Sequence, residues 1–249
     1  MENSIKFLFS GDSALVIEFG NEISVDINKK IRKMMDSIKK ENIDGIIELV
    51  PTYCSLLVNY DVLKVDYQSL VEKLKTLLND DNETVEDEEV TLIEIPTLYN
   101  DECGPDLSYV AEYNKLSKEE VIKIHTGTDY LVYMLGFMPG FTYLGGMSEK
   151  IATPRLESPR LQIYPGSVGI AGKQTGMYPS MSPGGWRIIG RTPLKLYNPN
   201  SETPVYISSG DYIRYVSISE EEYNNILKKV ENNEYKLNIH KVKRGELNA

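Results

Sequence analysis

Glycine is crowded into one part of this chain, and that crowding limits what the part can fold into. Eleven of the 18 glycines lie between Gly136 and Gly190, in a chain of 249 residues. Glycine weakens helices and permits the positive φ angles of tight turns, so the region favours short strands joined by turns. Many short strands with turn signals predict a β-barrel or a β-sandwich. The β-like runs are 129–137, 160–166, 186–191, 193–198, 203–210 and 211–218.

About the first 95 residues show a different pattern, because their apolar residues recur at the spacings of strands and helices. Their predicted order is β-α-β-β-α-β with one extra strand in front, which is the split βαβ or ferredoxin-like pattern. The fold class is therefore α+β, with a small α/β domain at 1–90 and a β-rich domain at 91–249. The predicted strands are 5–9, 13–20, 46–50, 56–60 and 90–95, and the helices are 24–40 and 67–78.

Three more helices are predicted beyond residue 100, at 106–116, 117–125 and 220–232. The second of them opens with a serine N-cap, Ser117, and has Glu120 three residues later, as in a capping box. The acidic run at 80–89 is expected to be a solvated loop, and the charged end of the chain is expected to face solvent together with His240.

Composition excludes several classes of function. No apolar run approaches the roughly 18 residues of a membrane span, and the first residues lack a signal peptide, which indicates a cytoplasmic protein without a membrane role. The formal net charge of -10 argues against nucleic-acid binding, because polyanion affinity depends on clustered Lys and Arg. Cys54 and Cys103 lie far apart without ligand spacing, so neither a disulfide nor a metal site is expected.

The glycine-rich region is locally basic although the whole chain is acidic. Residues 136–195 contain seven Lys or Arg and two acids. The two alternatives are a solvated surface and a site for a small anionic ligand. A Walker A loop is excluded because Ser167 replaces its first glycine and Gln174 follows Gly172-Lys173, and no G-x-G-x-x-G fingerprint occurs.

The glycines and prolines of this region are predicted to shape turns and a groove. These residues are Pro139, Gly140, Gly166, Gly169, Gly172, Gly176, Pro183, Gly184 and Gly185. Nearby aromatic residues are expected in the core or at a subunit interface. They are Phe137, Phe141, Tyr143, Tyr178 and Trp186.

Polar side chains interleaved with these turns are the candidate site. Arg155 and Arg160 each follow a proline, which suits an anion clamp, although an ion pair with Glu157 is the plain alternative. His125 is either a general base or substrate donor, or a helix C-terminal cap. Further candidates for binding substrate or anion are Lys173, Gln174, Thr175 and Arg191.

Four long motifs carry a resemblance to a known family. They read HTGTDYLVYMLGFMPGFTYLGGM from residue 125, ATPRLESPR from 152, GSVGIAGKQTGMYP from 166 and SPGGWRIIGRTP from 182. The chain resembles the KipI/PxpB family, which is related to allophanate hydrolase subunit 1 and to part of the carboxyltransferase region of urea carboxylase. The resemblance implies a small N-terminal α/β domain followed by a C-terminal cyclophilin-like β-barrel.

The resemblance also implies a function. It indicates the PxpB component of a 5-oxoprolinase, which opens 5-oxoproline to L-glutamate with hydrolysis of ATP, together with a KipA-like subunit (PxpC) and a LamB/YcsF-like subunit (PxpA). ATP with Mg²⁺ would be bound at the level of the complex, since this chain has no recognisable nucleotide motif. Alternatives are a KipI-type inhibitor of a sporulation histidine kinase and, more weakly, a carboxyltransferase-type subunit of urea metabolism.

Overall fold

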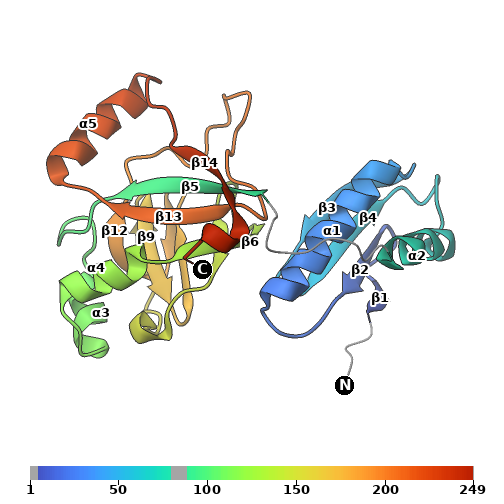
Figure 1. Ribbon diagram of the computed structural model, residues 1–249, viewed down its shortest axis with the longest axis horizontal. Helices are drawn as coiled ribbons and strands as arrows, with labels where there is room; N and C mark the ends of the chain where they lie inside the picture. Colours follow the sequence, from blue (N-terminus) through green and yellow to red (C-terminus); the bar gives the residue numbers. More distant parts are fainter. Residues whose placement is uncertain (1–4, 80–88, 249) are drawn as a thin grey trace. The chain divides into compact units, whose positions relative to one another are not determined.

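The computed structural model describes residues 5–79 and 89–248, and Figure 1 shows the chain coloured along its sequence. The chain divides into two compact units, residues 1–85 and 86–249, which are described separately below. Apart from Glu89, the acidic run at 80–89 lies outside the described residues. Over the described part of the chain, no helix is both long enough and apolar enough to cross a membrane.

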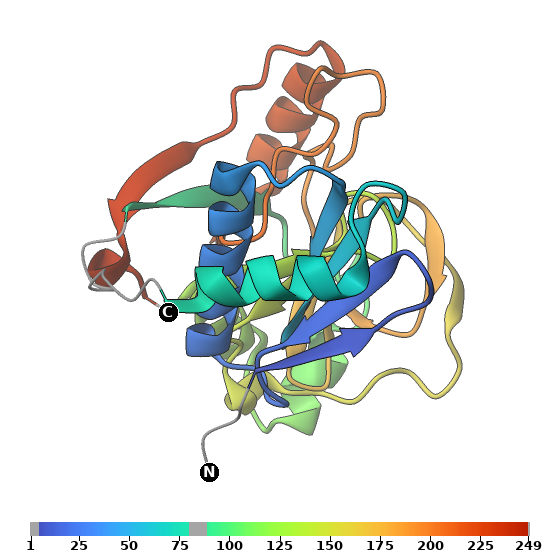
Figure 2. The same cartoon turned by 90° about the vertical axis from the view of Figure 1, so that its right-hand side faces the viewer.

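The first unit is one antiparallel sheet with helices on one face. Its strands follow the order β1-β2-β4-β3. Leu15 and Leu56 of the sheet belong to one buried cluster with residues of both helices, which is the core of the unit. Figures 1 and 2 show both helices packed against the sheet. The elements are β1 (Lys6–Phe9), β2 (Ala14–Glu18), α1 (Val25–Glu41), β3 (Ile46–Pro51), β4 (Ser55–Tyr60), α2 (Tyr67–Thr76) and a 3₁₀ turn (Leu77–Asn79).

Local sequence explains where these helices begin and end. Ser24 has extended backbone and accepts a hydrogen bond from the Asp26 amide, so it caps the start of α1. Asn42 follows α1 with φ of 47°, a left-handed conformation that asparagine tolerates. Asp66 caps α2 by accepting from the Ser69 amide. The predicted helices at 24–40 and 67–78 are confirmed on these signals.

The strand predicted at 90–95 is real, but its assignment to the first domain is wrong. It forms β5 (Glu89–Thr97), which pairs with β13 and β14 in the second unit. The edge position in the first sheet belongs instead to β1, which forms a hairpin with β2, closed by the Ser10 amide donating to the Ala14 carbonyl. Alternating apolar residues identify a strand, but they do not say which sheet receives it.

The second unit contains three sheets. A five-stranded sheet has the order β14-β5-β13-β6-β7, in which β5 and β13 are parallel and the other neighbours are antiparallel. The other two have the orders β10-β9-β12 and β11-β8. Their strands are β6 (Asp129–Leu135), β7 (Thr142–Gly145), β8 (Arg160–Ile163), β9 (Ser167–Ala171), β10 (Gln174–Met177), β11 (Ser182–Gly184), β12 (Arg187–Arg191), β13 (Tyr212–Ser217) and β14 (Ile239–Lys243).

Three helices complete the second unit, α3 (Leu107–Tyr113), α4 (Lys118–Thr126) and α5 (Glu220–Glu231). The predicted N-cap at Ser117 is confirmed, because Ser117 and Glu120 form a reciprocal capping box. Short 3₁₀ turns occupy Glu149–Ile151 and Arg244–Glu246. The charged tail, which was expected to face solvent, contains β14, and this strand pairs with the edge of β5.

The fold is therefore mixed α+β, as predicted, but the barrel is not closed within the described residues. A single pair of backbone hydrogen bonds between Leu98 and Arg191 joins the end of β5 to β12. The runs at 193–198 and 203–210 are not strands. Leu194, Leu196 and Ile207 are buried as their spacing suggested, but prolines in and around these runs remove the amides that a ladder needs.

Candidate functional site

Two of the predicted glycines are required for different physical reasons, one in a turn and one by close packing inside a strand. Gly172 lies in the turn between β9 and β10 with φ of +60°, which side chains rarely adopt. Gly184 has an ordinary φ, but a Cβ atom there would collide with the Tyr178 hydroxyl. The glycine-rich region is thus a set of antiparallel strands and tight turns, as predicted.

A buried carboxylate, Asp106, organises the basic side chains at the start of α3. Arg160 forms a bidentate ion pair with it, with Nη2 donating to Oδ1 at 2.9 Å and Nη1 lying 2.8 Å from Oδ2. The Ile188 amide also donates to Oδ2, at 2.7 Å, and Arg187 Nη1 lies 3.8 Å from Oδ1. Asp106 precedes a helix but makes no side-chain cap to it. Its carboxylate instead holds two arginines and β12.

This ion pair corrects the prediction for Arg160. The guanidinium was expected to bind a ligand or, as the plain alternative, Glu157, whereas it binds Asp106 inside the protein. Sequence reasoning missed Asp106 and the cation–π contact of Arg187, whose Cζ lies 3.7 Å from the Tyr109 ring centroid. The only signal for Asp106 was an acid in front of a predicted helix, which suggests a cap and not a long-range ion pair.

Arg155 lies in a very different setting. It is exposed, and within the described residues it makes no hydrogen bond or ion pair. Its backbone is nevertheless fixed on both sides. Thr153 and Gly172 exchange two backbone hydrogen bonds, of 3.1 and 2.7 Å, and the Leu156 amide donates to the Gly185 carbonyl at 2.7 Å. Arg155 is therefore an available cation on a well-anchored segment.

The Tyr178 hydroxyl is buried in a small aromatic core. Burial raises the pKa of the Tyr178 hydroxyl to about 12, and the positive charges of Arg155 and Arg160 act in the lowering direction. Tyr178 packs edge-to-face on Phe141 and Trp186 in a small aromatic core. These three aromatics were predicted to lie in the core or at a subunit interface, and the structure places them in the core.

The remaining predicted cations already contact groups of the protein. Lys173 Nζ lies 2.5 Å from Glu149 Oε1 in an exposed pair, and the Arg191 guanidinium carbon lies 5.1 Å from the Tyr164 ring centroid. Gln174 is half-buried at the start of β10. The structure therefore does not gather the predicted residues into one cluster, and Arg155 differs from the other predicted cations in having no described partner.

His125 is placed in the core. It is fully buried in the last turn of α4, with Nδ1 2.8 Å from the Tyr99 hydroxyl and Nε2 2.8 Å from the Thr175 hydroxyl. Burial lowers the pKa of His125 from 6.5 to about 3, because the charged ring loses its solvation. This placement does not support a role as general base, and the ring does not cap the helix carbonyls either.

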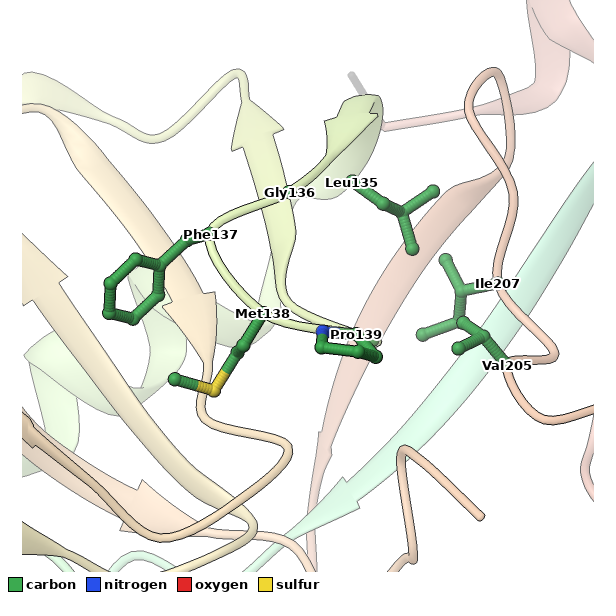
Figure 3. A pocket seen from close by; sticks show the side chains of 8 residues that line it. Leu135, Gly136, Phe137, Met138, Pro139, Val205 and Ile207 are labelled. Atoms are coloured by element: carbon green, nitrogen blue, oxygen red, sulfur yellow. The ribbon is translucent and has the colours of Figure 1, made fainter. Parts of the chain in front are cut away.

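An apolar hollow of about 490 Å³ opens beside the loop that follows β6. Leu135 and Pro139 face Val205 and Ile207 across it, while the Phe137 ring points away (Figure 3). Phe137 is 67% exposed and has φ of 61°, a strained conformation for an aromatic residue. The predicted turn at Pro139 and Gly140 is confirmed, with φ of +82° at Gly140. Of the two predicted settings for Phe137, core or subunit interface, its exposure excludes the core.

The described residues form a mixed α+β fold, with three sheets and glycine and proline turns in the second unit. Residues 5–207 match the family described as "Carboxyltransferase domain, subdomain C and D". The B subunit of 5-oxoprolinase from Bacillus subtilis is 46% identical over 86% of this chain and 92% of its own length. The corresponding protein from Escherichia coli O157:H7 is 36% identical over 83% of this chain and 93% of its own length.

One solved structure is also similar to this chain. A conserved uncharacterized protein from Pyrococcus horikoshii is 50% identical, with a TM-score of 0.52 over 88% of this chain and 100% of that one. The chain therefore belongs to the family of 5-oxoprolinase B subunits, within the carboxyltransferase subdomain C and D group. The predicted KipI/PxpB resemblance is confirmed.

Proposed function

We propose that this chain is the PxpB component of an ATP-dependent 5-oxoprolinase, which opens 5-oxoproline to L-glutamate and is inactive without its partners. The observation that carries the proposal is the 46% identity to a 5-oxoprolinase B subunit over most of both chains. The partners in the proposal are a KipA-like subunit and a LamB/YcsF-like subunit. The absence of a self-sufficient catalytic group among the predicted site residues supports a shared active site.

We further propose the finer architecture, in which the first unit is a ferredoxin-like variant and the second a cyclophilin-like open barrel. In support of the first, β2, β4 and β3 follow the strand order of a split βαβ unit, with β1 at the remaining edge. In support of the second, the buried residues of β5, β6, β9, β10, β12 and β13 belong to one core.

Arg155 is the residue of this chain best suited to the proposed substrate. 5-Oxoproline carries a carboxylate, and an arginine binds a carboxylate through two parallel charge-assisted hydrogen bonds. Arg155 is exposed and lies on a segment whose backbone is anchored on both sides. Binding the carboxylate there would orient the lactam, whose amide is a poor electrophile until its carbonyl oxygen is activated.

The chain has neither a Walker A loop nor a G-x-G-x-x-G fingerprint. The glycine-rich region that could have cradled phosphates is folded into strands β9 to β12, without the strand-loop-helix unit of a phosphate site. In the described part of the chain, no group of three or more His, Cys, Asp or Glu is placed to hold a metal ion. The proposal places ATP and Mg²⁺ at the level of the complex, and no step of the reaction is assigned to them here.

The test is reconstitution. The chain, its KipA-like partner and the LamB/YcsF-like subunit are purified, and ATP-dependent glutamate formation from 5-oxoproline is measured with each omitted in turn. We expect activity with all three and none without this chain. Glutamate formation at an equal rate in its absence, or no activity in an assembled three-subunit complex, would refute the proposal.

The apolar hollow favours a second candidate, inhibition of a histidine kinase. Its lining residues carry no charge, which suits an apolar protein segment better than an anionic substrate. Kinase autophosphorylation is measured with excess chain and with the variant Val205→Asp, which places a charge in the hollow. Inhibition by the unmodified chain that the variant loses is the expected result for this candidate. A kinase indifferent to both proteins would exclude it.

A further inference from the structure

The hydrogen bonds around His125 have a direction that can be worked out. The Thr175 hydroxyl carries one proton and donates it to the Gly169 carbonyl oxygen at 3.0 Å, because a carbonyl only accepts. Toward His125 Nε2, 2.8 Å away, the same hydroxyl therefore accepts, so Nε2 carries the ring proton. In a neutral ring Nδ1 is then the acceptor, and the Tyr99 hydroxyl donates to it at 2.8 Å.

This directed chain of hydrogen bonds ends on a hairpin that leads to the proposed substrate cation. Gly169 lies on β9 and Thr175 on β10, the two paired strands that the turn at Gly172 connects. Gly172 in turn exchanges two backbone hydrogen bonds with Thr153. Thr153 stands two residues before Arg155, so the backbone position of Arg155 depends on where this hairpin lies.

We infer that His125 is a positioning residue, held neutral with its proton on Nε2, which fixes the β9–β10 hairpin and, through Gly172 and Thr153, the place of Arg155. The role of Arg155 in this inference rests on the proposed function, whereas the state of the ring does not. His125 contacts neither solvent nor substrate and acts only through the hairpin. A fixed cation matters because small displacements of a binding group weaken substrate orientation strongly.

The ring state is tested by nuclear magnetic resonance on the full ¹⁵N-labelled chain. The sequence has two histidines, so a His240→Gln variant identifies the His125 signals. We expect a protonated-type Nε2 and an unprotonated-type Nδ1 at neutral pH. A proton on Nδ1, or on both nitrogens, would overturn the inference regardless of any enzyme assay.

The positioning role is tested by kinetics in the reconstituted complex. Thr175→Val removes the acceptor of Nε2 with little change in shape, and Thr175→Ser restores a hydroxyl. The matched control is Tyr130→Phe, which removes the hydroxyl bond to the His125 backbone carbonyl at 2.8 Å and leaves the ring contacts in place. We expect Thr175→Val to raise the KM for 5-oxoproline about tenfold, with kcat within twofold, and the Ser and Phe variants to keep the normal KM.

The outcomes separate the inference from the proposed function. An active complex in which Thr175→Val leaves KM unchanged, or in which Tyr130→Phe raises it equally, would overturn the positioning role. If Thr175→Val fails to fold, Tyr99→Phe removes the donor to Nδ1 at the other side of the ring and is held to the same expectation. A complex without activity contradicts the proposed function, while the ring state is still decided by resonance.

Discussion

The segment 154–160 contains two Pro-Arg pairs that look alike in sequence and lie in opposite environments. Arg160 forms a bidentate pair with a carboxylate that is 7% exposed, while Arg155 is exposed without a described partner. The first arginine therefore contributes to holding α3, β8 and β12 together, and the second is available to a ligand. An arginine directly after a proline is predicted to be a cation held in a fixed orientation. Only its partner in the tertiary structure decides whether that cation serves folding or binding.

The largest effect on stability is expected for the buried carboxylate that pairs with Arg160. Asp106→Ala leaves Arg160, Arg187 and the Ile188 amide without their acceptor, and breaking such a partly buried pair costs about 3 kcal/mol in the free energy of unfolding. Urea unfolding followed by circular dichroism measures it. The control is Asp101→Ala, whose exposed pair with Lys118 is worth less than about 0.5 kcal/mol. Equal losses in the two variants would remove the contrast.

A smaller effect concerns His125 and acid. Its folded pKa of about 3 lies below the ordinary 6.5, so the unfolded chain takes up a proton that the folded chain does not bind. This contribution to stability is present above pH 6.5 and is lost as pH falls toward 3, amounting to about 2 kcal/mol between pH 7 and pH 5. Between pH 7 and pH 5, the free energy of unfolding of the His125→Gln variant should fall by about 2 kcal/mol less than that of the unmodified chain. Unfolding measurements at both pH values test this. An equal fall in the free energy of unfolding of the two proteins would contradict the conclusion that the His125 ring is buried and neutral.

The smallest effect on stability is expected for the exposed arginine, Arg155. Arg155→Ala should change the free energy of unfolding by less than about 0.5 kcal/mol, since no described partner is lost. In the reconstituted complex it should raise the KM for 5-oxoproline about 10- to 100-fold, the loss expected for a hydrogen bond to a charged group. Lys173→Ala, which removes an exposed cation paired with Glu149, is the control and should leave KM unchanged. A marked loss of stability in Arg155→Ala, or a normal KM, would break the distinction between the two arginines.

Sequence predicted local structure far better than it predicted partners. The helices of the first unit follow from apolar spacing and caps such as Ser24, and Ser117 forms its predicted capping box. Glycine turns such as Gly172 follow from backbone sterics, which are also local. Partners distant in sequence were not predictable: β5 joins the sheet of the second unit, and Arg160 pairs with Asp106.

The candidate site shows the same limit. His125, Arg155 and Arg160 were chosen for their chemistry, and each choice was reasonable for an isolated side chain. Burial removes His125 from solvent and Asp106 occupies Arg160, so the predicted site reduces to Arg155 on an anchored segment. The hollow beside Phe137 was not predicted, because it depends on Val205 and Ile207 approaching from a distant loop.

The pairing of β5 with β13 and β14 has a consequence for how the chain is made. In the first unit, all strand partners lie between Lys6 and Tyr60, so its sheet can form soon after it leaves the ribosome. In the second unit, β5 is synthesised early but stays unpaired until β13 and β14, which come close to the end of the chain, have been made. Such long-range pairing forms slowly and leaves apolar strand edges exposed meanwhile. Interrupted synthesis should therefore release a folded first unit attached to an aggregation-prone strand.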